Sequence, residues 1–296
     1  MADDRYIPFS YRPAAKGNQG RGAIARAIGR AHAPVIAAGG GALQNPEATA
    51  IVATMDPKPT GARAMLIDNV VGSLKTAGVW DKLDWFCMFA GHDNQPSRIN
   101  WVNTSEILAV NGVLGSTITF VADDGWAGSH VSNQAYLSTN TAPDSFTHYV
   151  QNSACMGVYY KNTQAANDGN VIGSTTTAKN SMISRLTFPA GEARGNIHGV
   201  DSTLIQLVPA PATVSGLVAV DRNSSTLIRL VHNGTEIDTT GSTSATPEAT
   251  GVIVFLYQNG QAGSSQRISA GWLGASLNDT ELTAMTNAIA TYMAGI

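Results

Sequence analysis

Glu236 and Asp238 are the pair of residues whose spacing in this sequence comes nearest to hydrolytic chemistry. Glycoside hydrolysis uses two carboxyl groups that project into one cleft, one of them protonated and the other ionised. At i and i+2 of an extended strand, these two side chains would share one face. A third acidic residue would complete the pattern, but Thr240 stands at that position, and the segment should be the solvated return strand of a hairpin. We therefore expect no enzymatic activity and keep a polysaccharide hydrolase only as a disfavoured alternative.

Nucleophilic, cofactor and transition-metal chemistry are also disfavoured. His198, Asp201 and Ser202 have the residue types of a catalytic triad, but they crowd into five positions, and no Gly-x-Ser-x-Gly turn occurs in the chain. Residues 20–25 match a loose dinucleotide pattern, Gly-x-Gly-x-x-Ala, without the preceding buried strand that this fingerprint needs. The six histidines show no metal-ligand spacing. The sequence predicts no catalytic residue, no cofactor and no metal site.

Two loops carry the hard oxygen ligands that Ca²⁺ prefers, at residues 123–125 (Asp-Asp-Gly) and 167–170 (Asn-Asp-Gly-Asn). The same residue types are also favoured in tight turns, because they adopt the backbone conformations that turns require. We interpret both segments as turns, and occupation of either by Ca²⁺ stays open.

Composition narrows the function classes further. Apolar residues make up 43% of the chain and charged residues 13%, with a net charge of −3 and an isoelectric point near 6.0. These values exclude a globally basic nucleic-acid binder, and no apolar run is long enough to predict a membrane span. Cys87 and Cys155 have no Cys-x-x-Cys spacing, so we expect two buried free thiols and synthesis in a reducing cytoplasm.

Residues 1–58 differ in composition from the remainder of the chain, being rich in Ala and Gly, with no aromatic residue after Tyr11. Six basic residues face two acidic ones within the first 32 positions, although the whole chain is acidic. The segment is expected to be an extended arm that orders on a partner. The side chains expected to make that attachment are the arginines Arg5, Arg12, Arg21, Arg26 and Arg30.

Two helices are predicted in the remainder, residues 59–296. Apolar residues spaced at i, i+3, i+4 and i+7 predict a helix over 61–77, with Thr60 as its N-cap and Gly78 as its stop. A second helix is predicted over 279–293, where Asn278 and Glu281 form a capping-box pattern.

Between these helices, alternating apolar residues and frequent turn residues predict short strands. Asn233-Gly234 is the strongest hairpin signal, because a type I′ turn needs positive φ at both positions. Along 146–160 the even positions are the more apolar, which indicates a strand with one buried face. The predicted strands imply an all-β, two-sheet sandwich, and they span residues 83–90, 117–122, 134–138, 146–151, 154–161, 181–188, 203–208, 216–221, 226–232, 235–239, 251–257 and 266–273.

Several residue groups follow one another in an order that resembles tailed-phage and prophage virion proteins containing a concanavalin A-like, laminin G-like jelly roll. The resemblance covers most of residues 80–296 and leaves the arm outside it. The groups that carry it are residues 80–86 (WDKLDWF), Asn100-Trp101, Thr119-Phe120 with 124–128 (DGWAG), 136–139 (YLST), 151–159 (QNSACMGVY) and 274–282 (GASLNDTEL).

The resemblance implies a virion structural protein of the tail, collar, fibre or capsid decoration, which would assemble with other virion proteins. We also expect a homo-oligomer, with no nucleic-acid partner. The alternative function is a carbohydrate-binding module for host-surface glycans, in which Trp126, Tyr159 and Tyr160 would stack on sugar faces. Packing of the same rings in the core or at a subunit interface is the competing interpretation.

Overall fold

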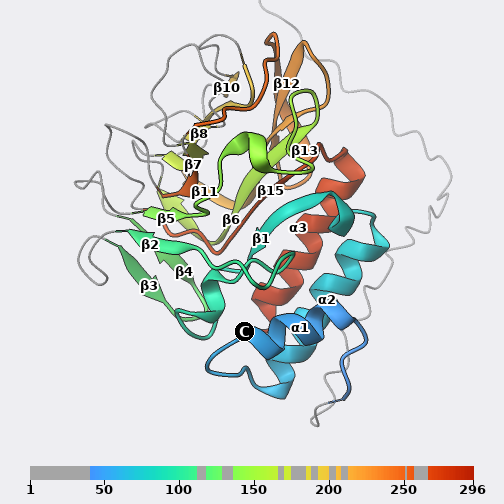
Figure 1. Cartoon of the computed structure of the whole chain (residues 1–296), viewed down its shortest axis with the longest axis vertical. Coiled ribbons are helices and arrows are strands. Elements are labelled where there is room, and N and C mark those ends of the chain that lie inside the picture. The colour runs from blue at the N-terminus through green and yellow to red at the C-terminus, as the bar shows by residue number, and fades with distance from the viewer. Residues whose placement is uncertain are drawn as a thin grey trace, which may run out of the picture. The chain divides into compact units, whose positions relative to one another are not determined.

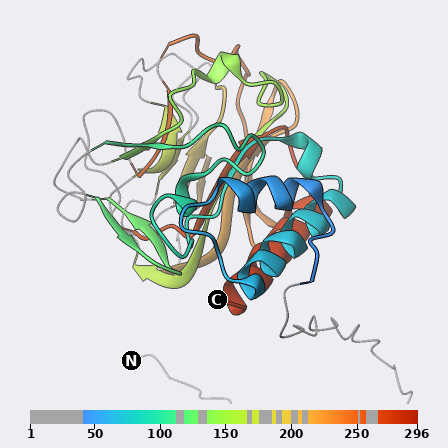
Figure 2. The same ribbon diagram turned by 60° about the horizontal axis from the view of Figure 1, so that its bottom comes forward.

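The structure, a computed structural model, describes residues 41–111, 118–128, 136–165, 170–174, 185–187, 193–199, 205–207, 213–250, 252–256 and 266–296. In this part of the chain most strands belong to two antiparallel sheets that pack face to face around an apolar core. Helices α1 (Pro46–Thr54), α2 (Gly61–Thr76) and α3 (Asp279–Ala294) lie together against the outer face of one sheet (Figure 1, Figure 2). The expected all-β jelly-roll sandwich with a closing helix is confirmed, but two helices, α1 and α2, precede it instead of one.

The first sheet has six strands and carries the helices on its outer face. In spatial order they are β1 (Leu83–Cys87), β15 (Ala270–Gly274), β6 (Ala154–Ala165), β11 (Thr213–Arg222), β12 (Leu227–His232) and β13 (Thr235–Gly241). The strands β1 and β13 therefore form its two edges.

The second sheet has seven strands. In spatial order they are β10 (Ile205–Leu207), β9 (Ala193–Asn196), β8 (Arg185–Thr187), β7 (Asn170–Ser174), β14 (Ile253–Phe255), β5 (Tyr136–Ser138) and β2 (Ala109–Asn111). A separate hairpin joins β3 (Thr119–Val121) to β4 (Gly125–Ala127), and short 3₁₀ turns occupy η1 (Trp80–Lys82), η2 (Pro96–Arg98) and η3 (Pro143–Ser145).

Strand β6 lies in the middle of the six-stranded sheet and is apolar on both faces. The even-numbered Met156, Val158 and Tyr160 enter the core between the sheets, as the alternation predicted. The odd-numbered Cys155 and Tyr159 pack instead beneath the helix layer. A sheet covered on both sides needs apolar residues at both sets of positions, so the helices explain the nearly continuous apolar run.

Both predicted helices are confirmed, together with their caps. The Thr60 hydroxyl accepts the backbone N–H of Arg63 at the start of α2, and the capping box of Asn278 and Glu281 opens α3. The apolar stripes of the two helices are buried against each other and the sheet. Burial of a large aliphatic side chain contributes about 1.5–3 kcal/mol, so these stripes hold the helix layer in place.

Helix α1 corrects the expectation of an extended arm up to residue 58. Ile51 is buried against α2, and the Asp68 carboxylate of α2 accepts the backbone N–H of Asn45 at 2.8 Å and that of Gln44 at 3.0 Å. The sequence did carry a signal, because Asn45-Pro46 places a capping residue type before a proline at the first helical position. Residues 1–40 of the expected arm lie outside the described residues.

Most expected strands overlap observed ones, and one is wrong. The hairpin at Asn233-Gly234 is confirmed, with φ of 50° and 79° at its two turn residues. Residues 146–151 do not form a strand: apart from an isolated bridge between Val150 and Ser153, this segment is a loop held by side-chain hydrogen bonds. The strands that the sequence did not predict are β2, β4, β7 and β9.

Both cysteines are buried and free, as expected. Among the described helices, none combines the length and hydropathy that crossing a bilayer requires.

Candidate functional site

The three aromatic side chains expected to contact a glycan are all buried. Trp126 and Tyr160 have no exposed surface, and Tyr159 has 9%. The Trp126 indole donates to Ser97 Oγ at 2.8 Å, and the Tyr160 hydroxyl donates to Gln266 Oε1 at 3.0 Å. These rings therefore pack inside the protein. The alternative expectation, that they stack on sugar faces, is wrong. The arginines Arg5, Arg12, Arg21, Arg26 and Arg30 lie outside the described residues.

Glu236 and Asp238 do not form the carboxylate pair that hydrolysis needs. Their strand β13 bulges opposite β12, so that Glu236 pairs with Val231 and Asp238 with Leu230. Because Leu230 and Val231 point to opposite faces of the sheet, the bulge places the two carboxylates on opposite faces as well. The expectation that they share a face is therefore wrong.

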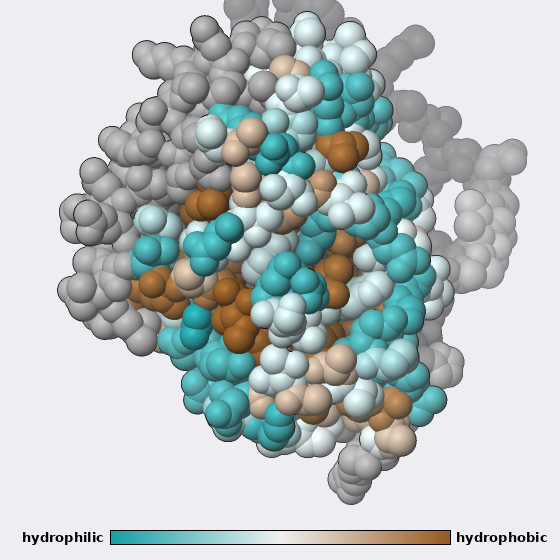
Figure 3. Space-filling view, in the orientation of Figure 1, coloured by the Kyte–Doolittle hydropathy of each residue, from teal (hydrophilic) through white to brown (hydrophobic). Residues whose placement is uncertain are grey.

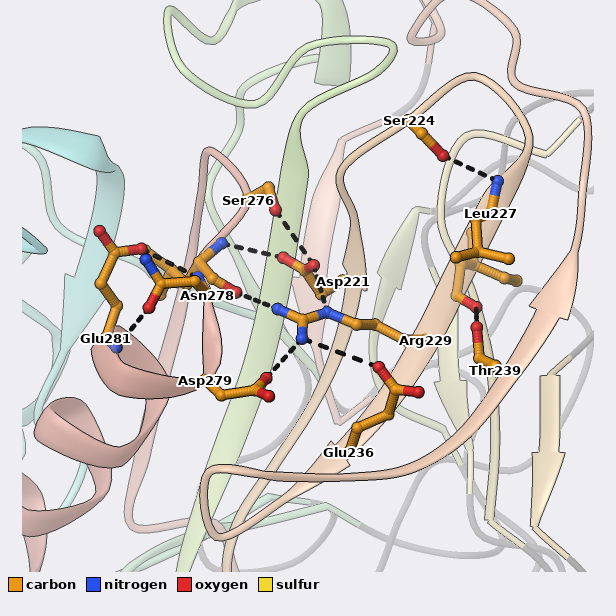
Figure 4. A network of polar contacts seen from close by, with 12 residues as sticks. Asp221, Ser224, Leu227, Arg229, Glu236, Thr239, Ser276, Asn278, Asp279 and Glu281 are labelled. Atoms are coloured by element: carbon orange, nitrogen blue, oxygen red, sulfur yellow. Dashed lines mark hydrogen bonds and ion pairs between the residues drawn. The ribbon is translucent and has the colours of Figure 1, made fainter.

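Glu236 belongs instead to the Arg229 cluster, which we define as Asp221, Arg229, Glu236, Ser276 and Asp279 (Figure 4). Arg229 Nε donates to Asp221 Oδ2 at 2.8 Å, and its Nη1 contacts Asp279 and, at 3.8 Å, Glu236. Asp221 also accepts the hydroxyl of Ser276 at 3.0 Å. The cluster joins the start of α3 to the six-stranded sheet, so we interpret it as a set of contacts that stabilises the fold.

The residues considered for a triad do not assemble one among the described residues. His198 is fully buried, its ring lies 4.5 Å from that of Tyr149, and neither ring nitrogen has a hydrogen-bond partner in the described structure. Burial and the nearby Arg222 lower the pKa of His198 to about 3. Such an imidazole cannot accept a proton near neutral pH, so it is no general base. Asp201 and Ser202 lie outside the described residues.

The turn interpretation is confirmed at Asp123-Asp124-Gly125. Asp123 adopts a positive φ of 64°, and its carboxylate accepts from Arg63 Nη2 at 2.6 Å. The Asp124 carboxylate lies 3.2 Å from Arg267 Nε. Arginines thus occupy the positions near these oxygens where a cation would bind. No cluster of three potential metal ligands occurs in the described ranges, and residues 167–169 fall outside them.

A surface pocket lies beside β1, at one edge of the six-stranded sheet. Its volume is about 260 Å³, and three segments line it: β1, the loop after Trp101 and the loop around η3. We call it the β1 pocket. Its lining residues are Leu83, Asp84, Trp85, Val102, Asn103, Glu106, Thr141, Ser145, Phe146, Thr147 and His148.

Two polar side chains fix the loops of the β1 pocket to the edge strand. The Asp84 carboxylate accepts three successive backbone N–H groups, from Thr147, His148 and Tyr149, at 2.8 to 3.1 Å. On the other side, Asn100 accepts the backbone N–H of Phe86 at 3.2 Å and donates to the carbonyl of Asp84 at 3.1 Å. The Asn100 bonds satisfy backbone groups that the edge strand would otherwise expose, and the Asp84 bonds satisfy backbone N–H groups of the loop at 147–149. The pocket is therefore held open by a preformed framework.

The rim of the β1 pocket combines polar groups with the ring of Phe146. Glu106 accepts an amide N–H from Asn103 at one oxygen and from Asn100 at the other, both at 2.9 Å. Phe146 is half-buried, and its ring packs edge to face on Tyr149 at 6.1 Å. The face that carries β1 shows hydrophobic residues gathered near its middle among hydrophilic ones (Figure 3). The pocket thus offers hydrogen-bonding groups beside apolar surface.

Sequence reasoning missed the β1 pocket, although Asp84 lies within residues 80–86, one of the groups that carry the resemblance. Asp84 is 63 to 65 residues away from the N–H groups that it accepts. No local pattern reports such a contact. The one available signal was the polar residue inside an otherwise apolar strand.

Fold and site together define a two-sheet antiparallel β-sandwich with a surface pocket at one sheet edge. No protein-family model and no curated protein sequence matches the chain. Among solved structures, the chain is similar to the binding domain of Paraclostridial Mosquitocidal Protein 1, with a TM-score of 0.47, 10% identity, and coverage of 70% of this chain and 52% of that one. It therefore spans about half the length of that domain.

Two shorter sandwich domains are also similar to this chain. One is domain 4 of AbnA, an extracellular arabinanase from Geobacillus stearothermophilus in complex with arabinotriose, with a TM-score of 0.40, 12% identity, and coverage of 69% of this chain and 98% of that one. The other is the carbohydrate-binding module of a Ruminococcus gnavus sialidase bound to α2,3-sialyllactose, with a TM-score of 0.35, 18% identity, and coverage of 46% and 83%. At these values the similarities do not by themselves assign a function.

Proposed function

We propose that this chain is a non-catalytic glycan-binding protein and that the β1 pocket is its binding site. The observation that carries the proposal is the convergence of amide, hydroxyl and carboxylate groups with the Phe146 ring on one preformed pocket. Sugars present hydroxyl groups around a ring with apolar faces, and small-ligand sites combine a few placed polar groups with apolar and aromatic surface. The volume of about 260 Å³ lies just below the usual range for small-ligand pockets, roughly 300–1,000 Å³, so the pocket suits a small ligand.

The arrangement of the pocket carboxylates supports binding rather than hydrolysis. A glycosidase needs one protonated carboxyl group that donates its proton to the leaving oxygen. Both oxygens of Asp84 and both oxygens of Glu106 accept N–H groups, which leaves neither placed to donate a proton. We therefore propose that the pocket binds sugar without cleaving it.

A glycan array probed with the full chain tests the proposal. We expect binding to a defined set of glycans, and we expect Phe146→Ala to weaken it by about tenfold, because the ring supplies the apolar contact of the pocket. The matched control is Leu227→Ala, which removes an exposed apolar side chain, 40% exposed, from β12. Absence of any glycan binding, or equal loss in both variants, would contradict the proposal.

Catalysis is tested separately with the glycans that bind. We expect no release of reducing ends on prolonged incubation, whereas a hydrolase would release them in proportion to protein concentration. Activity that disappears in Glu106→Gln would show that the pocket cleaves its ligand.

We further propose that the glycan-binding sandwich is displayed on a phage particle, after synthesis in the cytoplasm of the host. Support comes from the sequence resemblance over residues 80–296 and from the excess of basic residues in the first 32 positions of an acidic chain. In this proposal the arginines of residues 1–40 attach the protein, as a homo-oligomer, to other virion proteins of the capsid, collar or tail. A chain lacking residues 1–40 should still bind glycan but should no longer incorporate into particles, and normal incorporation would contradict the proposal.

A further inference from the structure

We infer that the β1 pocket takes uncharged sugars and rejects carboxylated or sulfated ones. This inference rests on the proposed glycan-binding function and adds the chemical class of the ligand. It follows from the charges that line the pocket and from the partners that those charges have.

With His148 counted as neutral at pH 7, the formal charges that line the β1 pocket are of one sign. Asp84 and Glu106 supply two carboxylates, and no lysine or arginine is among the lining residues. Lys82, the lysine nearest to Asp84 in sequence, donates to Glu281 at 2.7 Å. Arg98, the arginine nearest to Glu106 in sequence, donates to the Asn94 side chain at 3.0 Å and to the Leu108 carbonyl at 2.7 Å. Asp144, beside the lining residue Ser145, is exposed and adds a third negative charge near the rim.

The partners of these carboxylates are neutral. Asp84 accepts only backbone N–H groups, and Glu106 accepts only side-chain amides, in the described part of the chain. Neither forms an ion pair there, in contrast to Asp123, Asp124 and Asp221, each of which contacts an arginine. Hydrogen bonds from neutral groups orient a carboxylate but do not cancel its charge.

An anionic sugar in this pocket would therefore add a further negative charge beside Asp84 and Glu106, with no lysine or arginine among the lining residues to compensate it. Like charges placed together across a binding site are a common means of rejecting an unwanted ligand. A neutral sugar meets no such penalty, because its hydroxyl groups donate hydrogen bonds to carboxylate oxygens. We expect a neutral glycan to bind about tenfold or more tightly than its sialylated or sulfated form at low ionic strength.

The test is an array that carries neutral glycans beside their sialylated and sulfated counterparts, probed with the full chain. Each pair is measured at about 0.01 M and about 1 M NaCl, between which the Debye length falls from about 30 Å to about 3 Å. Discrimination caused by charge should shrink at high salt, whereas discrimination caused by shape should not. A ratio of neutral to acidic glycan affinity that is smaller at about 1 M than at about 0.01 M NaCl (about 3 Å against about 30 Å Debye length) supports the inference.

Variants separate the pocket charges from the net charge of the protein. Glu106→Gln removes one lining carboxylate, and Thr147→Lys adds a cation at an exposed lining position. Each variant should lower the ratio of neutral to acidic glycan affinity several-fold. The matched control is Asp238→Asn on β13, at the opposite edge of the sheet, which should leave the preference unchanged.

The outcomes distinguish this inference from the proposed function. Equal or tighter binding of acidic glycans, weakened by Phe146→Ala, would overturn the inference and leave glycan binding at the pocket intact. A neutral preference that neither salt nor the two pocket variants alter would also overturn it. Absence of binding to every glycan would overturn both proposals.

Discussion

The Arg229 cluster and the β1 pocket use the same types of polar residue for different ends. In the cluster, the guanidinium of Arg229 contacts three carboxylates, and Asp221 has no exposed side-chain surface. In the pocket, Asp84 and Glu106 are partly buried and, within the described part of the chain, accept hydrogen bonds from neutral groups. The cluster uses its hydrogen bonds to fix α3 to the sheet, whereas in the proposed function the pocket carboxylates also accept hydrogen bonds from a ligand. Buried charges require opposite charges as partners, whereas partly solvated ones do not.

The largest expected effect belongs to the cluster. Arg229→Met should lower the free energy of unfolding by about 3–5 kcal/mol, because it leaves the buried Asp221 carboxylate without its counter-ion. Urea unfolding followed by circular dichroism measures the change. The double variant Asp221→Leu with Arg229→Met removes both charges and should recover much of the loss, since apolar replacement of a whole pair is often close to neutral. Equal stability of Arg229→Met and the unaltered protein would show that the cluster is not structural.

His198 tests an intermediate case, a polar group as buried as Asp221 but without hydrogen-bond partners in the described residues. Its pKa is about 3 in the folded chain and near 6.5 in an unfolded one, so the unfolded state alone binds a proton between these values. The free energy of unfolding should therefore be undiminished above pH 6.5 and fall by up to about 1.4 kcal/mol per pH unit as the pH drops from 6.5 towards 3.

The control for this pH dependence is His198→Asn, because asparagine tolerates the positive φ of 48° at this position and does not titrate. Unfolding midpoints in urea, measured from pH 7 to pH 4 (about the range of the expected loss), should decline less steeply in the variant. Identical slopes in the two proteins would assign the acid sensitivity to other groups.

The next effect in size belongs to the β1 pocket. Asp84→Ala should lower the free energy of unfolding by about 1–3 kcal/mol, because three backbone N–H groups of residues 147–149 lose their acceptor. It should also reduce glycan binding, since the loop around η3 loses its attachment to β1. Chemical unfolding and array binding measure the two consequences. Retention of full binding would show that the loop needs no anchor at Asp84.

The features that could be predicted from the sequence are those that local patterns determine. Thr60, Asn278 and Glu281 act within one turn of their own helices, and Asn233-Gly234 acts within one hairpin, so local patterns predicted them. The β-sandwich followed from alternation of apolar residues along many strands. The caps and the hairpin turn depend on interactions between near neighbours in the chain, whereas the strand alternation depends only on which residues are apolar.

The candidate site depends on distant contacts, and it could not be predicted in the same way. Asp84 meets residues 147–149, and Asn100 meets β1, only after the sheet has formed. The bulge in β13 reversed the inferred orientation of Asp238 relative to Glu236, because one extra residue changes the face of all that follow. For Trp126 and Tyr160 the sequence left core packing and sugar stacking open, because aromatic type does not distinguish a core ring from an exposed one.

The smallest expected effect separates a contact that stabilises the Arg229 cluster from one that only lies beside it. Glu236 is 41% exposed, and its carboxylate lies 3.8 Å from Arg229 Nη1, farther than the 2.8 Å between Arg229 Nε and Asp221. Exposed pairs of this kind contribute little, so Glu236→Gln should change the free energy of unfolding by less than about 0.5 kcal/mol. Glycan binding should also be unchanged, because β13 lies at the sheet edge opposite the β1 pocket. Urea unfolding and the array check both expectations. A loss comparable to that of Arg229→Met would mean that the cluster depends on its exposed members as much as on Asp221, and a loss of binding would mean that the site extends across the sheet.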